Sequence, residues 1–173
     1  EAASMGIGAQ MTGAYDRSSN LLNVFDWRNV PMASRSSHLN VQTVAHEGTH
    51  QLTFNTGLLN RSGDAPTSII EGLGTYGEPR KVIGPSAVGR INVRRLDELA
   101  KYRRVADWIP LRDLIADDSL LREGLVAKVV LSYAQSWLLV HFLMQVPDWT
   151  PKFRDYLAAI RQRRAPTRRL EDA

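Results

Sequence analysis

The segment His46-Glu47-Gly48-Thr49-His50 constrains this chain more than any other, because it places two histidines four residues apart in a helical run. Such residues lie on one face of an α-helix, one turn apart, so both imidazoles can reach one zinc ion at about 2.0–2.1 Å. Glu47 lies about 100° around the helix from His46 and can act as a general base on water that the metal activates. The pattern therefore predicts a zinc-dependent hydrolase.

The residues around this motif predict a helix over about 38–56, because no proline occurs within it and its apolar residues mostly avoid the histidine line. Ser36 or Ser37 suits the N-cap, and Gly57 suits a left-handed position just after the helix. Gly48 costs about 1 kcal/mol relative to alanine and indicates close approach of another element. The alternative is a buried amphipathic helix whose histidines only satisfy hydrogen bonds.

A catalytic zinc needs a third protein ligand. The metzincin pattern is excluded, because it requires glycine at position 53 and histidine at position 56, and both are threonine. A glutamate on a following helix is the other route, and Glu71 supplies it, 21 residues after His50 and beyond a loop rich in turn formers. Thr75, one turn later, could hydrogen-bond a ligand. A solvated surface glutamate is the alternative for Glu71, and the rival ligands are Asp64, Glu78 and His141.

The remaining patterns predict an α+β fold, with a small, mostly antiparallel sheet, then the motif helix and a mainly helical C-terminal half. A β-hairpin is expected over residues 11–27, with strands near 11–15 and 21–25. Further helices are expected at about 67–77, 91–104, 110–115, 125–146 and 151–164. Residues 1–165 would form one domain, and residues 166–173 a basic tail or linker.

The predicted helix at 125–146 carries Tyr133, Trp137 and His141 at four-residue spacing, so they share one face. A tyrosine facing the zinc could hydrogen-bond the oxyanion of a tetrahedral intermediate, which can lower the barrier by about 3–4 kcal/mol. Tyr133 is the candidate for this role and His141 the second choice. The alternative is that all three are core or interface aromatics.

Three segments resemble the gluzincin metallopeptidases: residues 13–26, 46–52 and 71–76, which read GAYDRSSNLLNVFD, HEGTHQL and EGLGTY. Residues 132–137 (SYAQSW) match a downstream helix. Within the gluzincins the chain is most similar to a peptidase-MA-like family that is catalogued as a domain of unknown function and found largely in bacteria. The resemblance spans roughly residues 12 to 145.

This resemblance implies a zincin-like fold, with His46, His50 and Glu71 as zinc ligands and Glu47 as the base. It also implies that the hairpin pairs with extended substrate by adding a strand to the sheet, and ordinary sheet pairing is the alternative. Gly74 departs from the pattern, since relatives usually carry alanine there, and this departure is expected to touch no ligand.

Composition bounds the remaining possibilities. The chain has 173 residues, a formal net charge of +4 and no cysteine, so it has neither disulfides nor thiolate metal sites. Its arginine-rich end lacks a known nucleic-acid-binding module, so no nucleic-acid partner is expected. No apolar run reaches about 18 residues, which predicts no membrane span. The start, without methionine or signal sequence, suggests a processed product or excised fragment and says nothing about whether the parent is exported. The sequence leaves the location unknown, with a secreted or cell-envelope location slightly favoured over the cytoplasm.

The sequence therefore predicts a metallopeptidase that hydrolyses peptide or protein substrates, with one Zn²⁺ per chain and Glu47 as general base. Cleavage of internal peptide bonds is favoured. Two alternatives stay open. One is a non-catalytic zinc-binding or interaction module, and the other is a zinc hydrolase of a non-peptide amide or ester.

Overall fold

A computed structural model describes residues 13–25, 33–78, 88–104 and 106–162, with side chains of the first helix described from residue 41 onward. The predicted α+β class is confirmed: a two-stranded antiparallel sheet is followed by helices. In chain order the elements are β1 (Gly13–Asp16), β2 (Leu21–Val24), α1 (Ala33–Asn55), α2 (Thr67–Gly77), α3 (Val93–Tyr102), α4 (Leu111–Ala116), the 3₁₀ helix η3 (Asp118–Leu121), α5 (Val126–Gln145) and α6 (Thr150–Ile160). The predicted tail at 166–173 lies outside the described residues.

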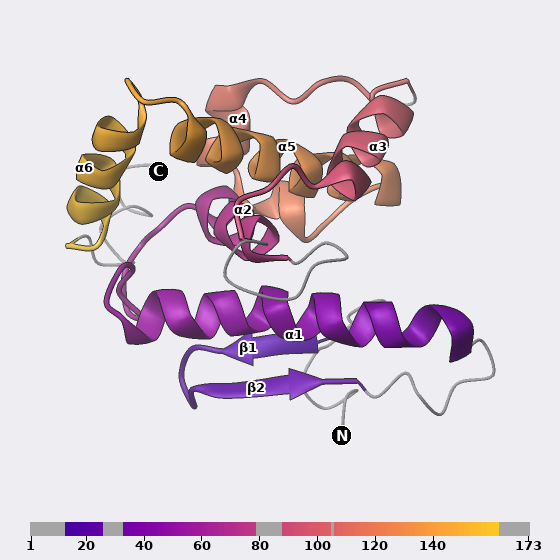
Figure 1. Ribbon diagram of the computed structural model, residues 1–173. Helices are drawn as coiled ribbons and strands as arrows, with labels where there is room; N and C mark the ends of the chain where they lie inside the picture. The colour runs from indigo at the N-terminus through magenta and orange to yellow at the C-terminus, as the bar shows by residue number, and fades with distance from the viewer. Residues whose placement is uncertain (1–12, 26–32, 79–87, 105, 163–173) are drawn as a thin grey trace.

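The elements form layers in which α1 separates the hairpin from the other helices (Figure 1). β1 and β2 pack on one side of α1, and α2 packs on the other. Beyond α2 lies α5, the long helix that also contacts α3 and α6. Both motif-bearing helices, α1 and α2, are thereby held face to face in the middle of the molecule.

The hairpin follows from its turn chemistry. β1 and β2 pair antiparallel, with Tyr15 opposite Leu22 and Asp16 opposite Leu21. The Asp16 carboxylate accepts hydrogen bonds from Ser18 N at 2.9 Å, Ser18 Oγ at 2.7 Å and Ser19 Oγ at 2.5 Å. Asn20 completes the reversal with φ of 60°, a left-handed conformation that asparagine tolerates better than most residues. The expected hairpin is confirmed: β2 lies within the predicted second strand, and β1 begins at Gly13, the first residue that the structure describes.

The motif helix begins earlier than predicted. α1 starts at Ala33, so Ser36 and Ser37 lie within it and neither caps it. Its end is as expected: Gly57 follows in a left-handed conformation, with φ of 71°. The close approach predicted at Gly48 is wrong, because a Cβ built there meets nothing within 4 Å.

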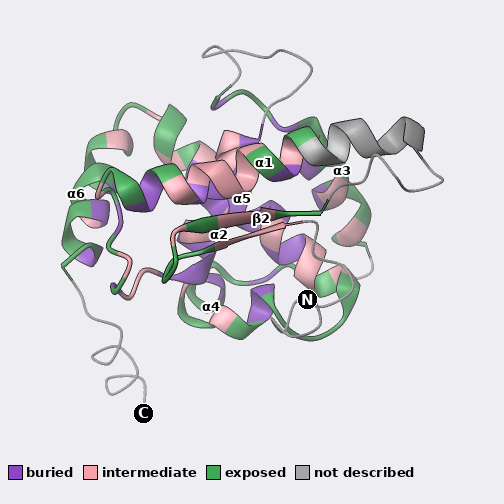
Figure 2. Ribbon diagram, turned by 90° about the horizontal axis from the view of Figure 1, so that it is seen from below, coloured by how far each residue is buried: buried purple, intermediate pink, exposed green. Residues whose placement is uncertain are grey.

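The largest buried cluster joins α2, α5 and α6, and Figure 2 shows the buried positions gathered between them. Its members are Phe54, Leu59, Ile69, Leu73, Val140, Phe153, Leu157 and Ile160. A second cluster, with Leu99 of α3 and Trp137 of α5 among its members, attaches α3 to this core. α3 is thereby fixed beside the two motif helices.

Helix α5 has the length and mean hydropathy of a membrane-spanning helix, 20 residues and 1.3, although the sequence contains no uninterrupted apolar run. It alone passes this test among the described residues. The core helix of a folded domain passes too, and α5 buries seven residues against its neighbours. Its apolar character is therefore weak evidence for a membrane span.

Candidate metal centre

His46, His50 and Glu71 come together between α1 and α2. His46 Nε2 lies 3.1 Å from His50 Nε2 and 3.0 Å from Glu71 Oε2, and His50 Nε2 lies 3.5 Å from the same Glu71 oxygen. Ligand atoms around a tetrahedral zinc at about 2.0–2.1 Å are about 3.3–3.4 Å apart. The three side chains therefore form a group that could hold a metal ion, and their two nitrogens and one oxygen suit zinc.

The rival ligands do not join this group. Among the described residues, the cluster of potential metal ligands contains only the two motif histidines and Glu71, and Asp64 is outside it. His141 stacks on Trp137, with ring centroids 5.1 Å apart, and lies beside Tyr76. Glu78 contacts His46 but from the opposite edge of the ring, at Nδ1.

Glu78 is the outer partner of His46. Its Oε1 lies 3.1 Å from His46 Nδ1, while the His46 Nε2 edge faces Glu71. A carboxylate in this position fixes the ring orientation of a metal-binding histidine and makes the ring more basic. Sequence reasoning had placed Glu78 among the rival ligands. The structure instead places Glu78 at His46 Nδ1, on the ring edge that faces away from Glu71.

Two residues of the α3 region hold Glu78 in turn. The Arg95 guanidinium donates to Glu78 Oε1 at 2.7 Å, and Asn92 Nδ2 donates to Glu78 Oε2 at 2.9 Å. Arg95 and Glu78 are only 6% and 7% exposed, and Arg95 also pairs with Glu98 at 2.9 Å. Neither Asn92 nor Arg95 was predicted, because their segment reads only as an amphipathic helix with basic residues. Asn92 also caps α3 by accepting from Arg95 N.

The carboxylates control the charge of His46 in the metal-free protein. Burial lowers the pKa of His46, but hydrogen bonds and charge from Glu71 and Glu78 outweigh burial and raise that pKa to about 10. Burial raises the pKa of both glutamates, yet their bonds to His46 hold the pKa of Glu71 well below its usual range and lower that of Glu78 to about 2. A proton on His46 therefore competes with a metal cation for this site.

Glu47, the predicted base, is held by the hairpin. The backbone N–H of Tyr15 in β1 donates to Glu47 Oε2 at 2.8 Å. The other oxygen, Oε1, accepts no hydrogen bond from the described residues, which leaves it available to a water molecule or ligand. One strand of the sheet thus orients the carboxylate through its main chain.

Tyr133 and the two aromatics that follow it have different surroundings. The Tyr133 ring lies beside the Arg95 guanidinium, whose Cζ is 5.7 Å from the ring centroid. Burial, then the charge of Glu71, raises the pKa of Tyr133, so its hydroxyl stays protonated and can donate. Trp137 is buried in the core, 1% exposed, as the alternative interpretation expected. His141 packs on it, away from the metal-binding group.

Two expectations about α2 are wrong. A Cβ built on Gly74 would lie 2.7 Å from His50 Cε1 and 2.9 Å from His46 Nε2, so this position contacts both histidines, contrary to the prediction that it touches no ligand. The Thr75 hydroxyl donates to the main-chain oxygens of Glu71 and Gly72 rather than to a ligand side chain. The close approach of α2 to α1 therefore occurs at Gly74 and at Gly77, where a Cβ would lie 2.9 Å from Thr49 Cβ.

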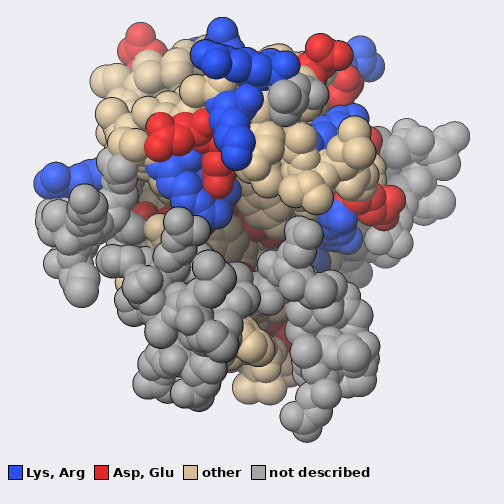
Figure 3. Space-filling model, turned by 90° about the vertical axis from the view of Figure 1, so that its right-hand side faces the viewer, with Lys and Arg blue, Asp and Glu red and all other residues tan. Residues whose placement is uncertain are grey.

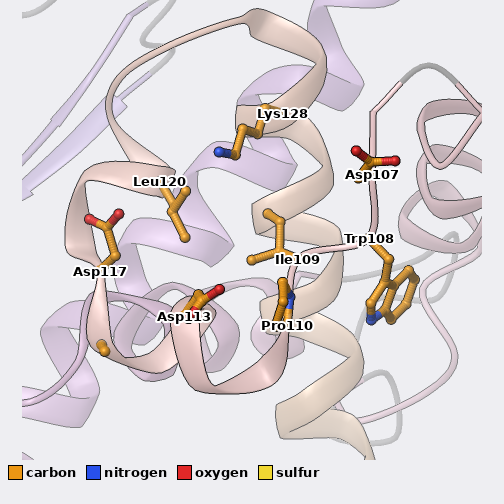
Figure 4. Close-up of a pocket in the computed structure, with 9 residues that line it drawn as sticks. Asp107, Trp108, Ile109, Pro110, Asp113, Asp117, Leu120 and Lys128 are labelled. Atoms are coloured by element: carbon orange, nitrogen blue, oxygen red, sulfur yellow. The ribbon is translucent and has the colours of Figure 1, made fainter.

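A separate hollow of about 500 Å³ lies around α4 and η3 (Figure 4). Acidic side chains surround an apolar floor in it, and it contains none of the predicted site residues; its lining includes Asp107, Trp108, Ile109, Pro110, Asp113, Asp117, Leu120 and Lys128. On the face shown in Figure 3, basic and acidic side chains alternate over the surface and do not gather into one basic patch.

Comparison with known families bears on the segment that holds this geometry. Residues 40–167 match a family described as a protein of unknown function (DUF1570). The chain belongs to this family. No curated protein matches the chain, and no solved structure matches it.

The match places the candidate metal centre inside the DUF1570 domain. Its span begins within α1 and continues past α6, so it includes both histidines, Glu71, the Glu78–Arg95 pair and Tyr133. The hairpin lies before the matched span, although β1 supplies the hydrogen bond to Glu47. The part of the chain that orients the candidate base is thus outside the matched region.

Proposed function

We propose that this DUF1570 domain is a zinc-dependent metallopeptidase of the gluzincin type that hydrolyses internal peptide bonds. The observation that carries the proposal is the convergence of His46, His50 and Glu71 from two helices, with Glu47 adjacent on α1. The two imidazole nitrogens and one carboxylate oxygen fit zinc. His46 Nδ1, which faces away from Glu71, contacts the Glu78 carboxylate, and zinc-binding histidines usually have a carboxylate or carbonyl partner at this nitrogen.

Bound zinc would supply two effects, a lowered pKa of a coordinated water and polarisation of the substrate carbonyl. Glu47 would accept the proton of the attacking water at Oε1 and deliver it to the leaving amine. The Tyr15 N–H on Oε2 keeps the carboxylate from rotating and leaves one oxygen for this transfer. In this proposal one oxygen of Glu47 serves to orient the carboxylate and the other to transfer the proton.

The Tyr133 hydroxyl would donate a hydrogen bond to the substrate carbonyl oxygen as that oxygen gains negative charge. Two observations support this role: the hydroxyl has no hydrogen-bond partner among the described residues, and its raised pKa keeps the proton in place. Arg95, beside the ring, would fix the ring position. A structural zinc site does not require a carboxylate with a free oxygen beside the ligands, which favours the catalytic proposal over a binding module.

The test compares the wild-type protein with Glu47→Gln and Glu71→Ala. Metal content after dialysis should be about one zinc per chain in the wild type and in Glu47→Gln, and much lower in Glu71→Ala. Hydrolysis of a mixed fluorogenic peptide library should occur only with the wild type. Peptide cleavage by Glu47→Gln at the wild-type rate would refute the assigned base. An absence of bound zinc in the wild type would refute the metal centre.

A further inference from the structure

A polar hollow opens at the end of β1, beside the last turn of α1. It is lined by Tyr15, Asp16, Arg17, Ser18, Arg61 and Ser62 and has a volume of about 650 Å³. Its walls are the β1–β2 turn and the loop after α1, which lie side by side at the end of α1 where that helix passes into the loop (Figure 1). Two arginines and two serines therefore face one cavity from two segments about 45 residues apart in the sequence.

Both arginines of this hollow are anchored to adjacent residues of α1. The Arg17 guanidinium lies over the ring of Phe54, with Cζ 5.5 Å from the centroid. The Arg61 guanidinium donates to Asn55 Oδ1. Within the described part of the chain, neither arginine forms an ion pair. An anionic ligand in the hollow would therefore be attracted by two guanidinium charges that no ion pair neutralises.

Asp16 is the acidic group of the hollow, and its carboxylate is already engaged. It accepts bonds from the Ser18 amide, the Ser18 hydroxyl and the Ser19 hydroxyl, all within its own turn. The lining therefore carries two arginines and one aspartate, a formal net charge of +1. The free guanidinium donors favour a carboxylate, which arginine binds with charge-assisted and often bidentate hydrogen bonds.

Tyr15 connects the hollow to the candidate active site, because it lines the hollow and its N–H donates to Glu47. The Tyr15 N–H points away from β2 toward Glu47, so the backbone groups of Gly13 and Tyr15 form the outer edge of β1. β1 runs in the same direction as α1, because Gly13 lies against Thr43 and Glu47 while Arg17 lies against Phe54. Phe54 is four residues beyond His50, or about 6 Å along the helix.

We propose that this hollow is a specificity subsite for an acidic side chain of the peptide substrate, located about two or three residues on the N-terminal side of the cleaved bond, given about 3.3 Å per residue in an extended chain. An extended substrate antiparallel to β1 would pair with the main-chain groups of this edge other than the Tyr15 N–H, which Glu47 accepts. It would run from Arg17 toward Gly13, so its N-terminal part would lie over the hollow. The inference rests on the proposed function, because it takes the metal centre as the point of cleavage.

The experiment uses pairs of fluorogenic peptides that differ only by Glu or Gln at each position on the N-terminal side of the bond. Wild type is compared with Arg17→Gln, Arg61→Gln and the double variant. Arg112→Gln, which removes an exposed charge on α4 outside the hollow, is the matched control. We expect a Glu-over-Gln preference in kcat/KM of roughly tenfold, carried by KM, weaker in high salt, and lost in the double variant but not in the control.

A binding assay separates this inference from the proposed function. The same peptide pairs are titrated against zinc-loaded Glu47→Gln by fluorescence anisotropy, which needs no turnover. Tighter binding of Glu peptides that depends on Arg17 and Arg61 would support the subsite, even if no peptide were cleaved and the peptidase proposal failed. Equal binding of Glu and Gln peptides, or a preference that survives in the double variant, would overturn the subsite whatever the activity.

Discussion

Replacing Glu78 with glutamine should weaken zinc binding without removing any ligand. Glu78 lies 3.1 Å from His46 Nδ1 and is 7% exposed, so its charge acts on the ring with little screening by solvent. Changing such an outer partner commonly lowers metal affinity about 10- to 100-fold, or about 1.4–2.7 kcal/mol at 1.36 kcal/mol per factor of ten. The upper part of this range is expected, because glutamine keeps the shape but loses the negative charge.

This substitution also affects folding, since Glu78 pairs with buried Arg95 at 2.7 Å. Removing one partner of a buried pair can cost about 3–5 kcal/mol, but Arg95 keeps a second partner, Glu98, at 2.9 Å. Glu98→Gln is therefore the matched control, because it also weakens the pairing of Arg95 without touching His46. Thermal denaturation of both metal-free variants measures this shared effect.

Zinc affinity is then measured by competition with a chromophoric chelator at pH 7, under conditions where circular dichroism shows each variant folded. Glu78→Gln should bind zinc at least about tenfold more weakly than Glu98→Gln. Equal zinc affinities in wild type, Glu78→Gln and Glu98→Gln would refute the role of Glu78 in supporting His46. Equal weakening in both variants would assign the effect to Arg95 and the packing of α3 instead.

Three further results are expected. Gly74→Ala should weaken zinc binding about tenfold, because the new Cβ would lie within 3 Å of both histidines, nearer than the usual contact of about 3.5–4.0 Å. The control Gly48→Ala adds a Cβ in open space and should bind zinc normally. Chelator competition measures both variants, and equal zinc affinities would refute the contact. Zinc affinity should rise about tenfold per pH unit from pH 6 to pH 8. The pKa of metal-free His46 is raised to about 10, so the ring is protonated in this range and must lose one proton when zinc binds. A zinc affinity that calorimetry finds independent of pH would contradict this. Tyr133→Phe should lower kcat about 100-fold with zinc content and KM little changed, and an unchanged kcat would remove Tyr133 from the mechanism.

The elements that sequence analysis predicted best are those bounded by residues with strong turn or helix-ending preferences. The helix expected at 67–77 has these bounds in the structure, because Pro66 precedes it and a turn-rich loop separates it from α1. Gly57 and the 16–20 turn are likewise governed by residues with particular backbone preferences. The start of α1 was missed by about five residues, since serines within a helix resemble serines that cap one.

The candidate ligands could be predicted from spacing, but their support could not. His46 and His50 lie together because four residues make one turn, and this requires no tertiary information. Arg95 reaches Glu78 only because α3 packs against α5 and returns to the metal-binding group, a non-local contact across 17 residues. One sequence gives no signal for such a pair, since an arginine on an amphipathic helix is usually solvated.

The EGLGTY segment supplies Glu71, and its glycines also determine how closely α2 packs against its neighbours. Gly72 faces α5, where a Cβ would lie 2.6 Å from the main-chain oxygen of Ser136, while Gly74 faces the imidazoles of α1. Side chains at these two positions would push α2 away from one neighbour or the other. Because Glu71 can meet both histidines only when α2 lies close to α1, and α2 is held there by α5, the glycines allow the close packing on which the ligand distances depend. A glycine inside a helix is costly for the helix alone, and here that cost is offset by the close packing on both sides.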